Sequence, residues 1–197
     1  MNYKVLIVLL AAVGLSGCLH DDDGNDVSPD NLSGTWIQPC NTSEYNDASD
    51  SQLVINGAEW LSQTTIYHDS ECLEPFFTVR MEQISIAGEE VTLSSGTLAT
   101  EVERTTTGVF MTPETSLDAT SFNSGQFCGI ATWAVDKEED ITSCTGFFSF
   151  TIGEARYDIY KVENNRLYHG KHDAPDRGDT PETRPTSLDY EDVYQRQ

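Results

Sequence analysis

The chain has 197 residues, with 11 Lys or Arg against 33 Asp or Glu, which gives a formal charge of −22 at neutral pH. This charge repels nucleic acid and anionic lipid head groups, so we exclude nucleic acid as a partner. We interpret it as a solvated, self-repelling surface suited to high ionic strength, with a cationic partner or bound calcium as the alternative. The length fits one domain with a sizeable core.

The N-terminal residues have the pattern of an export signal. A short basic start, residues 1–4, precedes an apolar run over residues 5–15 that is too short for a transmembrane helix. The next residues, Leu15-Ser16-Gly17-Cys18, resemble the lipobox of bacterial lipoproteins. The resemblance implies that residues 1–17 are a signal peptide and that Cys18 is acylated with diacylglycerol and palmitate. Cys18 would then anchor the chain in the lipid bilayer.

A tether is expected after the anchor. Leu19 stands where an aspartate would retain a lipoprotein at the inner membrane, so we expect the outer membrane of the cell envelope. Residues 18–31 are dominated by Asp, Gly, Asn, Ser and Pro, the composition of a flexible acidic linker. Removal of residues 1–17, which include Lys4 and no acidic residue, leaves 180 residues with a formal charge of −23.

Short runs of alternating β-branched and aromatic residues follow, without a sustained helical period. They predict strands over residues 34–38, 52–55, 58–68, 76–87, 90–93, 98–111, 125–135, 145–152, 156–162 and 166–170. Turn-forming pairs separate many of them, including Asn56-Gly57, Ala87-Gly88 and Asn164-Asn165. We therefore predict an all-β fold, a single antiparallel up-and-down meander that hides its edges by closing into a β-barrel of about eight to ten strands.

The expected barrel domain covers residues 32–171. Its longest irregular connection, residues 112–123, is placed to cross the barrel mouth as a lid or short helix. Residues 172–197 are rich in Pro, Asp, Glu and Thr before a few apolar groups, so we expect an extended tail that docks partly on the barrel.

Four cysteines remain besides Cys18, and an even number in an oxidising compartment predicts two disulfides. Of the three possible pairings, we favour Cys40 with Cys72 and Cys128 with Cys144, because they close the shortest loops. Each would contribute about 3 kcal/mol by restricting the unfolded chain. A metal site is the alternative, but the cysteines have no CxxC spacing and no flanking histidines, so we expect no metal there.

The segment Leu32-Ser33-Gly34-Thr35-Trp36 resembles the G-x-W signature in the first strand of lipocalins and related calycins. With Cys40, Tyr67-His68-Asp69, Cys72 and residues 184–189, the chain resembles lipocalin-like, calycin-type lipoproteins of marine γ-proteobacteria. The resemblance implies a lipocalin-like barrel whose base Trp36 closes, and it carries no activity. In lipocalins a basic residue near the last strand packs on this Trp, and Lys161 and Arg166 are the candidates.

Catalytic motifs are absent from the sequence: it has no nucleophile elbow, no HExxH pair and no phosphate-binding glycine loop. His68 with Asp69 could make a base and its orienter, and His169 with His172 could bind a metal, but each pair lacks a third member. We therefore expect a protein that is not an enzyme and that carries no cofactor.

Three functional hypotheses remain. The first is a periplasm-facing or surface binding module whose barrel mouth, lined by Trp60, Phe76, Phe110 and Trp133, holds a small or hydrophobic ligand. The second is an accessory subunit of an envelope protein complex, with the barrel as scaffold. The third and weakest is a hydrolase or isomerase that uses His68 and Asp69.

Overall fold

The computed structural model describes residues 32–42, 48–144, 146 and 151–197. The first five strands are β1 (Gly34–Thr42), β2 (Ala48–Asn56), β3 (Glu59–Tyr67), β4 (Pro75–Thr92) and β5 (Leu98–Pro113). Then come helix α1 (Ser116–Gly125), the 3-10 turn η2 (Phe127–Gly129) and the short strand β6 (Glu139–Asp140). The last elements are β7 (Ala155–Glu163), β8 (Arg166–Gly170), the 3-10 turn η3 (Pro181–Thr183) and β9 (Leu188–Arg196).

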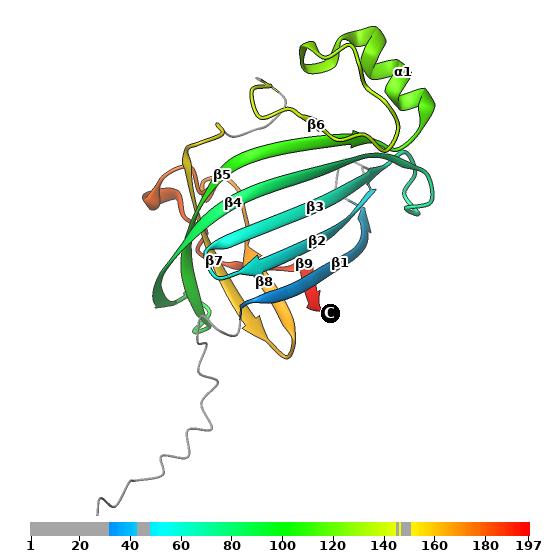
Figure 1. Ribbon diagram of the computed structural model, residues 1–197. Coiled ribbons are helices and arrows are strands. Elements are labelled where there is room, and N and C mark those ends of the chain that lie inside the picture. Colours follow the sequence, from blue (N-terminus) through cyan, green and yellow to red (C-terminus); the bar gives the residue numbers. More distant parts are fainter. Residues whose placement is uncertain (1–31, 43–47, 145, 147–150) are drawn as a thin grey trace, which may run out of the picture.

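Eight of the described strands form one closed antiparallel barrel (Figure 1). Strands β1 to β5 pair in chain order, β5 pairs with β7, and β7 to β9 continue the meander. Closure comes from β9, which returns to pair with β1 at Trp36 and Ile37. The additional strand β6 pairs only with β5, at Phe110 and Met111. The predicted all-β, up-and-down, lipocalin-like barrel is therefore confirmed.

Turn chemistry explains most of the hairpins. Gly57 has a φ of +58°, and Asn164 and Asn165 have φ of 53° and 59°, as tight hairpin turns require. The prediction of a turn at Ala87-Gly88 is wrong, because β4 continues through it with a register shift between Ala87 and Glu90. A Cβ on Gly88 would lie 2.8 Å from the Cβ of Glu101, so this glycine instead allows β4 to approach β5 closely.

The strand predicted over residues 125–135 is also wrong. Gln126, Cys128 and Gly129 adopt positive φ values of 47°, 52° and 75°, which break any extended run. The aromatic residues that suggested a strand, Phe127 and Trp133, instead pack around Phe122 of α1. The strand predicted over residues 145–152 lies mainly outside the described residues.

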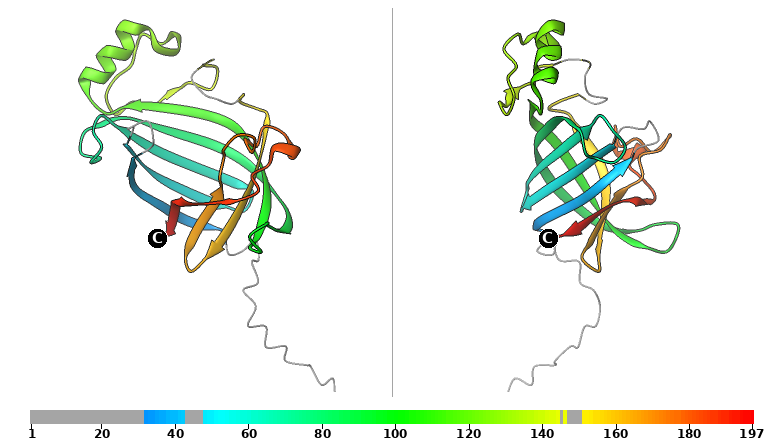
Figure 2. Two further views of the ribbon diagram at one scale, coloured as in Figure 1. Left: turned by 180° about the vertical axis from the view of Figure 1, so that it is seen from behind. Right: turned by 90° about the vertical axis from the view of Figure 1, so that its right-hand side faces the viewer.

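Residues 112–123 supply the end of β5 and most of α1, so the expected short helix is present. Its N-cap is Thr115, whose side chain accepts a hydrogen bond from the backbone N–H of Asp118 at 3.2 Å. The helix stands beyond the ends of β4 and β5 (Figures 1 and 2). It covers an apolar cluster that includes Val109, Met111 and Trp133.

The expected C-terminal tail supplies the last strand of the barrel. Leu188–Arg196 forms β9 between β8 and β1, so the barrel extends from Gly34 to Arg196 instead of ending near residue 171. The sequence hid this strand because Asp192, which β9 turns toward the barrel interior, is polar. The connection 171–187 contains the 3-10 turn η3, and most of it lies along the outside of the barrel (Figure 2), while residues 171–173 line the barrel interior.

Trp36 closes the base of the barrel. Its side chain is fully buried and its Nε1 donates to the backbone oxygen of Leu32 at 2.8 Å. The guanidinium of Arg196 lies 4.4 Å from the centre of the indole ring and donates to the backbone oxygen of Ser33. The basic residue on this Trp is therefore Arg196, in place of the candidates Lys161 and Arg166. An apolar layer above Trp36 includes Leu53, Ile55, Trp60, Val102, Tyr160 and Leu167.

Candidate functional site

A cavity of about 720 Å³ occupies the barrel interior above this apolar layer. Every one of the eight barrel strands contributes a side chain to its wall. In strand order these are Gln38, Ser51, Ser62, Met81, Arg104, Asp158, His169 and Asp192. The cavity is therefore the lumen of the barrel, and its size is that of a small-molecule site.

The cavity wall is mainly polar. Hydroxyl and amide groups come from Ser49, Ser51, Ser62, Thr64, Gln38, Gln83, Asn41 and Thr42, while Leu53 and Met81 are the aliphatic members. Two of the hydroxyls, on Ser51 and Thr64, hydrogen-bond each other at 2.8 Å. Such a wall can exchange many hydrogen bonds with a ligand and offers little apolar surface to a lipid chain.

A buried carboxylate on β7 organises one side of the cavity. The side chain of Asp158 is 1% exposed. Its Oδ1 accepts from the backbone N–H groups of Ile159 at 2.8 Å and Gly170 at 3.0 Å. Its Oδ2 pairs with Nη2 of Arg104 and lies 3.4 Å from Nε2 of His172. Three donors thus bind a single carboxylate, and the His172 ring lies beside it.

This arrangement determines the protonation states of Asp158 and His169. Burial raises the pKa of the Asp158 carboxyl, but Arg104 together with His172 and His169 outweighs it and holds that pKa at about 2. Burial, followed by repulsion from Arg104, lowers the pKa of His169 to about 4. At neutral pH, Asp158 is therefore ionised and His169 is neutral.

Three buried side-chain nitrogen atoms in and beneath this wall of the cavity have no hydrogen-bond partner among the described residues. They are Nε of Arg104, Nδ1 of His169 and Nε1 of Trp60. The guanidinium of Arg104 lies 5.4 Å from the centre of the Trp60 ring, and the rings of Trp60 and His169 are 6.2 Å apart. Nε of Arg104 and Nε1 of Trp60 are donors, and an unpaired buried donor is costly, whereas Nδ1 of His169 is a donor or an acceptor depending on the tautomer.

The β9 side of the cavity is acidic. Asp189, Glu191 and Asp192 all line it, and no ion pair among the described residues includes any of them. Asp192 accepts a hydrogen bond from Nε2 of Gln38. Burial, together with the charge of Asp189, raises the pKa of Asp192. Lys171, which also lines the cavity, interacts electrostatically with Glu191 and Asp189, so Asp192 is the member of this wall without a cationic partner among the described residues.

The four aromatic residues expected to line the barrel mouth are distributed elsewhere. None of them is among the described residues that line the cavity. Trp60 belongs to the apolar layer beneath it, and Phe76 and Trp133 pack in the cluster under α1. Phe110 lies on the outer face of β5, where the guanidinium of Arg80 is 4.0 Å from its ring centre.

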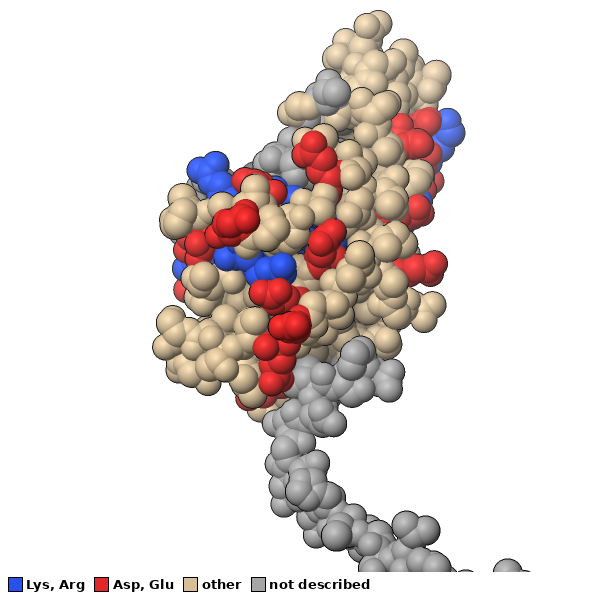
Figure 3. All heavy atoms as spheres, turned by 90° about the vertical axis from the view of Figure 1, so that its left-hand side faces the viewer, with Lys and Arg blue, Asp and Glu red and all other residues tan. Residues whose placement is uncertain are grey.

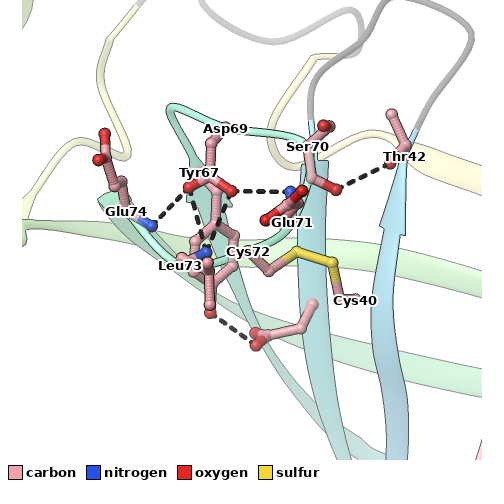
Figure 4. The surroundings of a disulfide bond; sticks show 10 residues. Cys40, Thr42, Tyr67, Asp69, Ser70, Glu71, Cys72, Leu73 and Glu74 are labelled. Atoms are coloured by element: carbon pink, nitrogen blue, oxygen red, sulfur yellow. Dashed lines mark hydrogen bonds between the residues drawn. A yellow bond between two sulfur atoms is a disulfide. The ribbon is translucent and has the colours of Figure 1, made fainter.

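His68 and Asp69 do not act on each other as a base and its orienter. Nε2 of His68 lies 3.0 Å from Oδ1 of Asp118 on α1. The carboxylate of Asp69 instead accepts from the backbone N–H groups of Glu71, Leu73 and Glu74 and so shapes its own loop (Figure 4). Desolvation raises the pKa of the Asp69 carboxyl, but these backbone hydrogen bonds outweigh it and lower that pKa below its ordinary value.

Both predicted disulfides are confirmed. Cys40 of β1 is bonded to Cys72 in the loop between β3 and β4, beside the Asp69 turn (Figure 4). Cys128 is bonded to Cys144 in the segment between α1 and β7. The anchor candidate Cys18 lies outside the described residues.

His169 and His172 come together at the cavity, but around a carboxylate. Nδ1 of His169 lies 3.9 Å from Oδ2 of Asp158, the atom that His172 also approaches. No group of three or more His, Cys, Asp or Glu in the described part of the chain could hold a metal ion. Sequence patterns do not single out Arg104, Asp158 or Asp192, because an isolated charged residue in a strand is usually solvated.

Fold and site together define a class of protein: an eight-stranded, lipocalin-like barrel with a polar lumen. Comparison with known families and with curated proteins finds no family model and no relative that matches the chain. Within the described residues, no helix is long and apolar enough to cross a membrane.

Proposed function

We propose that this protein is a binding module that takes a small polar molecule into the lumen of its barrel. The observation that carries the proposal is the cavity of about 720 Å³ to which all eight barrel strands contribute. Its polar wall favours a hydrophilic ligand over the hydrophobic one that the aromatic residues suggested. Arg104 and His169 in the wall give further support, since a few placed polar groups are typical of small-molecule sites.

The chemistry of the lumen favours binding over catalysis. A general base must be free to accept a proton near neutral pH. The Asp158 carboxylate, with a pKa of about 2, is instead occupied by Arg104 and by two backbone N–H groups. His169 is an uncharged imidazole with a pKa of about 4, a weak base at neutral pH. We accordingly assign Asp158 and Arg104 the role of positioning the cavity wall.

A pair of neighbouring substitutions on β3 tests the proposal. Ser62 faces the cavity, while Gln63 faces the outside of the barrel beside Arg80. Ser62→Phe should fill the lumen, and Gln63→Phe adds the same side chain outside it. Wild-type protein and both variants are incubated with a water-soluble cell extract, repurified by gel filtration and denatured, and released molecules are identified by mass spectrometry.

We expect wild-type protein and Gln63→Phe to release the same small polar molecule and Ser62→Phe to release none. Thermal unfolding curves of both variants serve as the control for folding. The proposal fails if no variant retains a molecule, or if a folded Ser62→Phe variant retains as much as wild type.

We further propose that the barrel is held at the outer membrane through acylated Cys18. Support comes from the lipobox-like sequence Leu15-Ser16-Gly17-Cys18 and the linker-like composition of residues 19–31. In cells grown with labelled palmitate, the wild-type chain should carry label and enter the detergent phase. Cys18→Ser should do neither, and a labelled Cys18→Ser chain would refute the assignment.

A further inference from the structure

The cavity has two chemically different sides, and this difference bears on what it binds. The side formed by β5, β7 and β8 presents the guanidinium of Arg104 and the imidazole rings of His169 and, from the following segment, His172. The positive charge of Arg104 on this side is already matched by Asp158. This side is thus close to neutral and rich in hydrogen-bond donors, which suits the oxygen atoms of a ligand.

The other side, formed by β9 and the residues just before it, presents carboxylates. Lys171 also lines the cavity, and its Nζ lies 3.4 Å from Asp173. Its positive charge acts on Glu191 and Asp189 as well, so Asp192 is the carboxylate of this side without a cationic partner among the described residues. Asp192 is the most enclosed of the three, and its described hydrogen-bond partners are Gln38 and the Asp189 side chain, which its own N–H contacts at 3.2 Å.

The charge of the whole protein adds to this asymmetry. On the face shown in Figure 3, Asp and Glu side chains form a run over the lower part of the described surface. A chain with a formal charge of −22 creates a field that draws cations toward any opening in its surface. A cationic group placed beside Asp192 would also remove the repulsion between that carboxylate and Asp189.

We infer that the ligand of this cavity is a small organic cation that carries hydroxyl groups, with its ammonium group at Asp192 and its oxygen atoms toward Arg104 and His169. The inference rests on the proposed binding function and adds the ligand's charge and orientation to it. Hydroxyl groups match the Ser, Thr and Gln side chains of the wall. An organic cation is favoured over a metal ion because no described group of residues has metal-holding geometry.

Three sugars of similar shape and different charge serve as probes. Glucosamine carries an ammonium group, glucose is neutral and glucuronate carries a carboxylate. Binding of each is measured by isothermal titration calorimetry to wild-type protein, to Asp192→Asn and to Glu163→Gln. The last variant removes one negative charge from β7 at a half-exposed pair with Lys161 and leaves the cavity wall unchanged.

We expect glucosamine to bind wild type on the order of tenfold more tightly than glucose or glucuronate, the gain of one charge-assisted hydrogen bond. Asp192→Asn should abolish this preference without weakening glucose binding, and Glu163→Gln should keep it. Equal or tighter binding of glucose or glucuronate in the cavity overturns the inference while the binding function stands. If none of the three binds, the inference is likewise overturned, and repurification from cell extract decides the binding function separately.

Discussion

The carboxylate of Asp158 offers the sharpest test of how the lumen is built. Asp158→Asn keeps the shape of the side chain and leaves an oxygen that can still accept from the backbone of Ile159 and Gly170. The amide nitrogen would then face the guanidinium of Arg104, donor against donor, and the positive charge would lose its partner. Because the Asp158 side chain is 1% exposed, water cannot replace that interaction.

Removing one partner of a buried ion pair costs about 3–5 kcal/mol of unfolding free energy, and we expect a loss in this range for Asp158→Asn. The assay is urea unfolding with the disulfides intact, followed by tryptophan fluorescence, with the m-value checked for constancy. The matched control on the same strand is Glu163→Gln, which breaks a half-exposed pair and should cost at most about 1 kcal/mol. A loss below about 1 kcal/mol for Asp158→Asn, or equal losses in the two variants, would refute the view that the buried Asp158 carboxylate holds this side of the cavity together.

Three further predictions concern the same framework. The pKa of His169 is about 4 in the fold against 6.5 in the unfolded chain, so the unfolded state binds the proton first and stability should fall by about 3 kcal/mol from pH 6.5 to 4. In His169→Gln, the part of this fall that comes from His169 should be lost, so the free energy of unfolding from urea curves should drop less between pH 6.5 and 4 than in the wild type. An unchanged pH profile would contradict the assignment. Gly170→Ala should lower the free energy of unfolding by about 1–3 kcal/mol, because the new Cβ would lie 2.5 Å from Oδ1 of Asp158. An unchanged melting temperature would contradict tight packing between Gly170 and Asp158. Replacing Cys40 and Cys72 together by Ala opens a crosslink between residues 32 apart and should cost about 4 kcal/mol, measured by chemical unfolding against the wild-type protein under oxidising conditions.

The parts of the fold that depend on local chemistry could be predicted from the sequence. Asn56-Gly57 and Asn164-Asn165 form hairpin turns because their positive φ values are a property of those residue types. The disulfides followed from the cysteine spacing and the expected compartment. Burial of Trp36 at the base followed from the resemblance of the first strand to lipocalins.

The parts that depend on the polar lumen could not be predicted. Strand prediction assumes that inward residues are apolar, whereas β9 turns Asp192 and Tyr194 into the cavity, so the sequence of β9 predicts a tail and not a strand. Arg196 could not be predicted to pack on Trp36, because it lies on this unpredicted strand. Of the aromatic residues expected to line a cavity, Trp60, Phe76 and Trp133 instead pack in apolar clusters, because burying their large apolar surface is more favourable than exposing it to a polar lumen. Phe110 lies outside the barrel beneath the Arg80 guanidinium.

A crystal structure of the wild-type protein, repurified from a water-soluble cell extract, would show whether the barrel lumen holds a small polar molecule. We expect electron density for a small molecule inside the barrel, in contact with Arg104 or His169 on one side and with Asp192 on the other. A lumen filled by the protein's own side chains, or a retained molecule bound outside the barrel, would refute the proposed binding function.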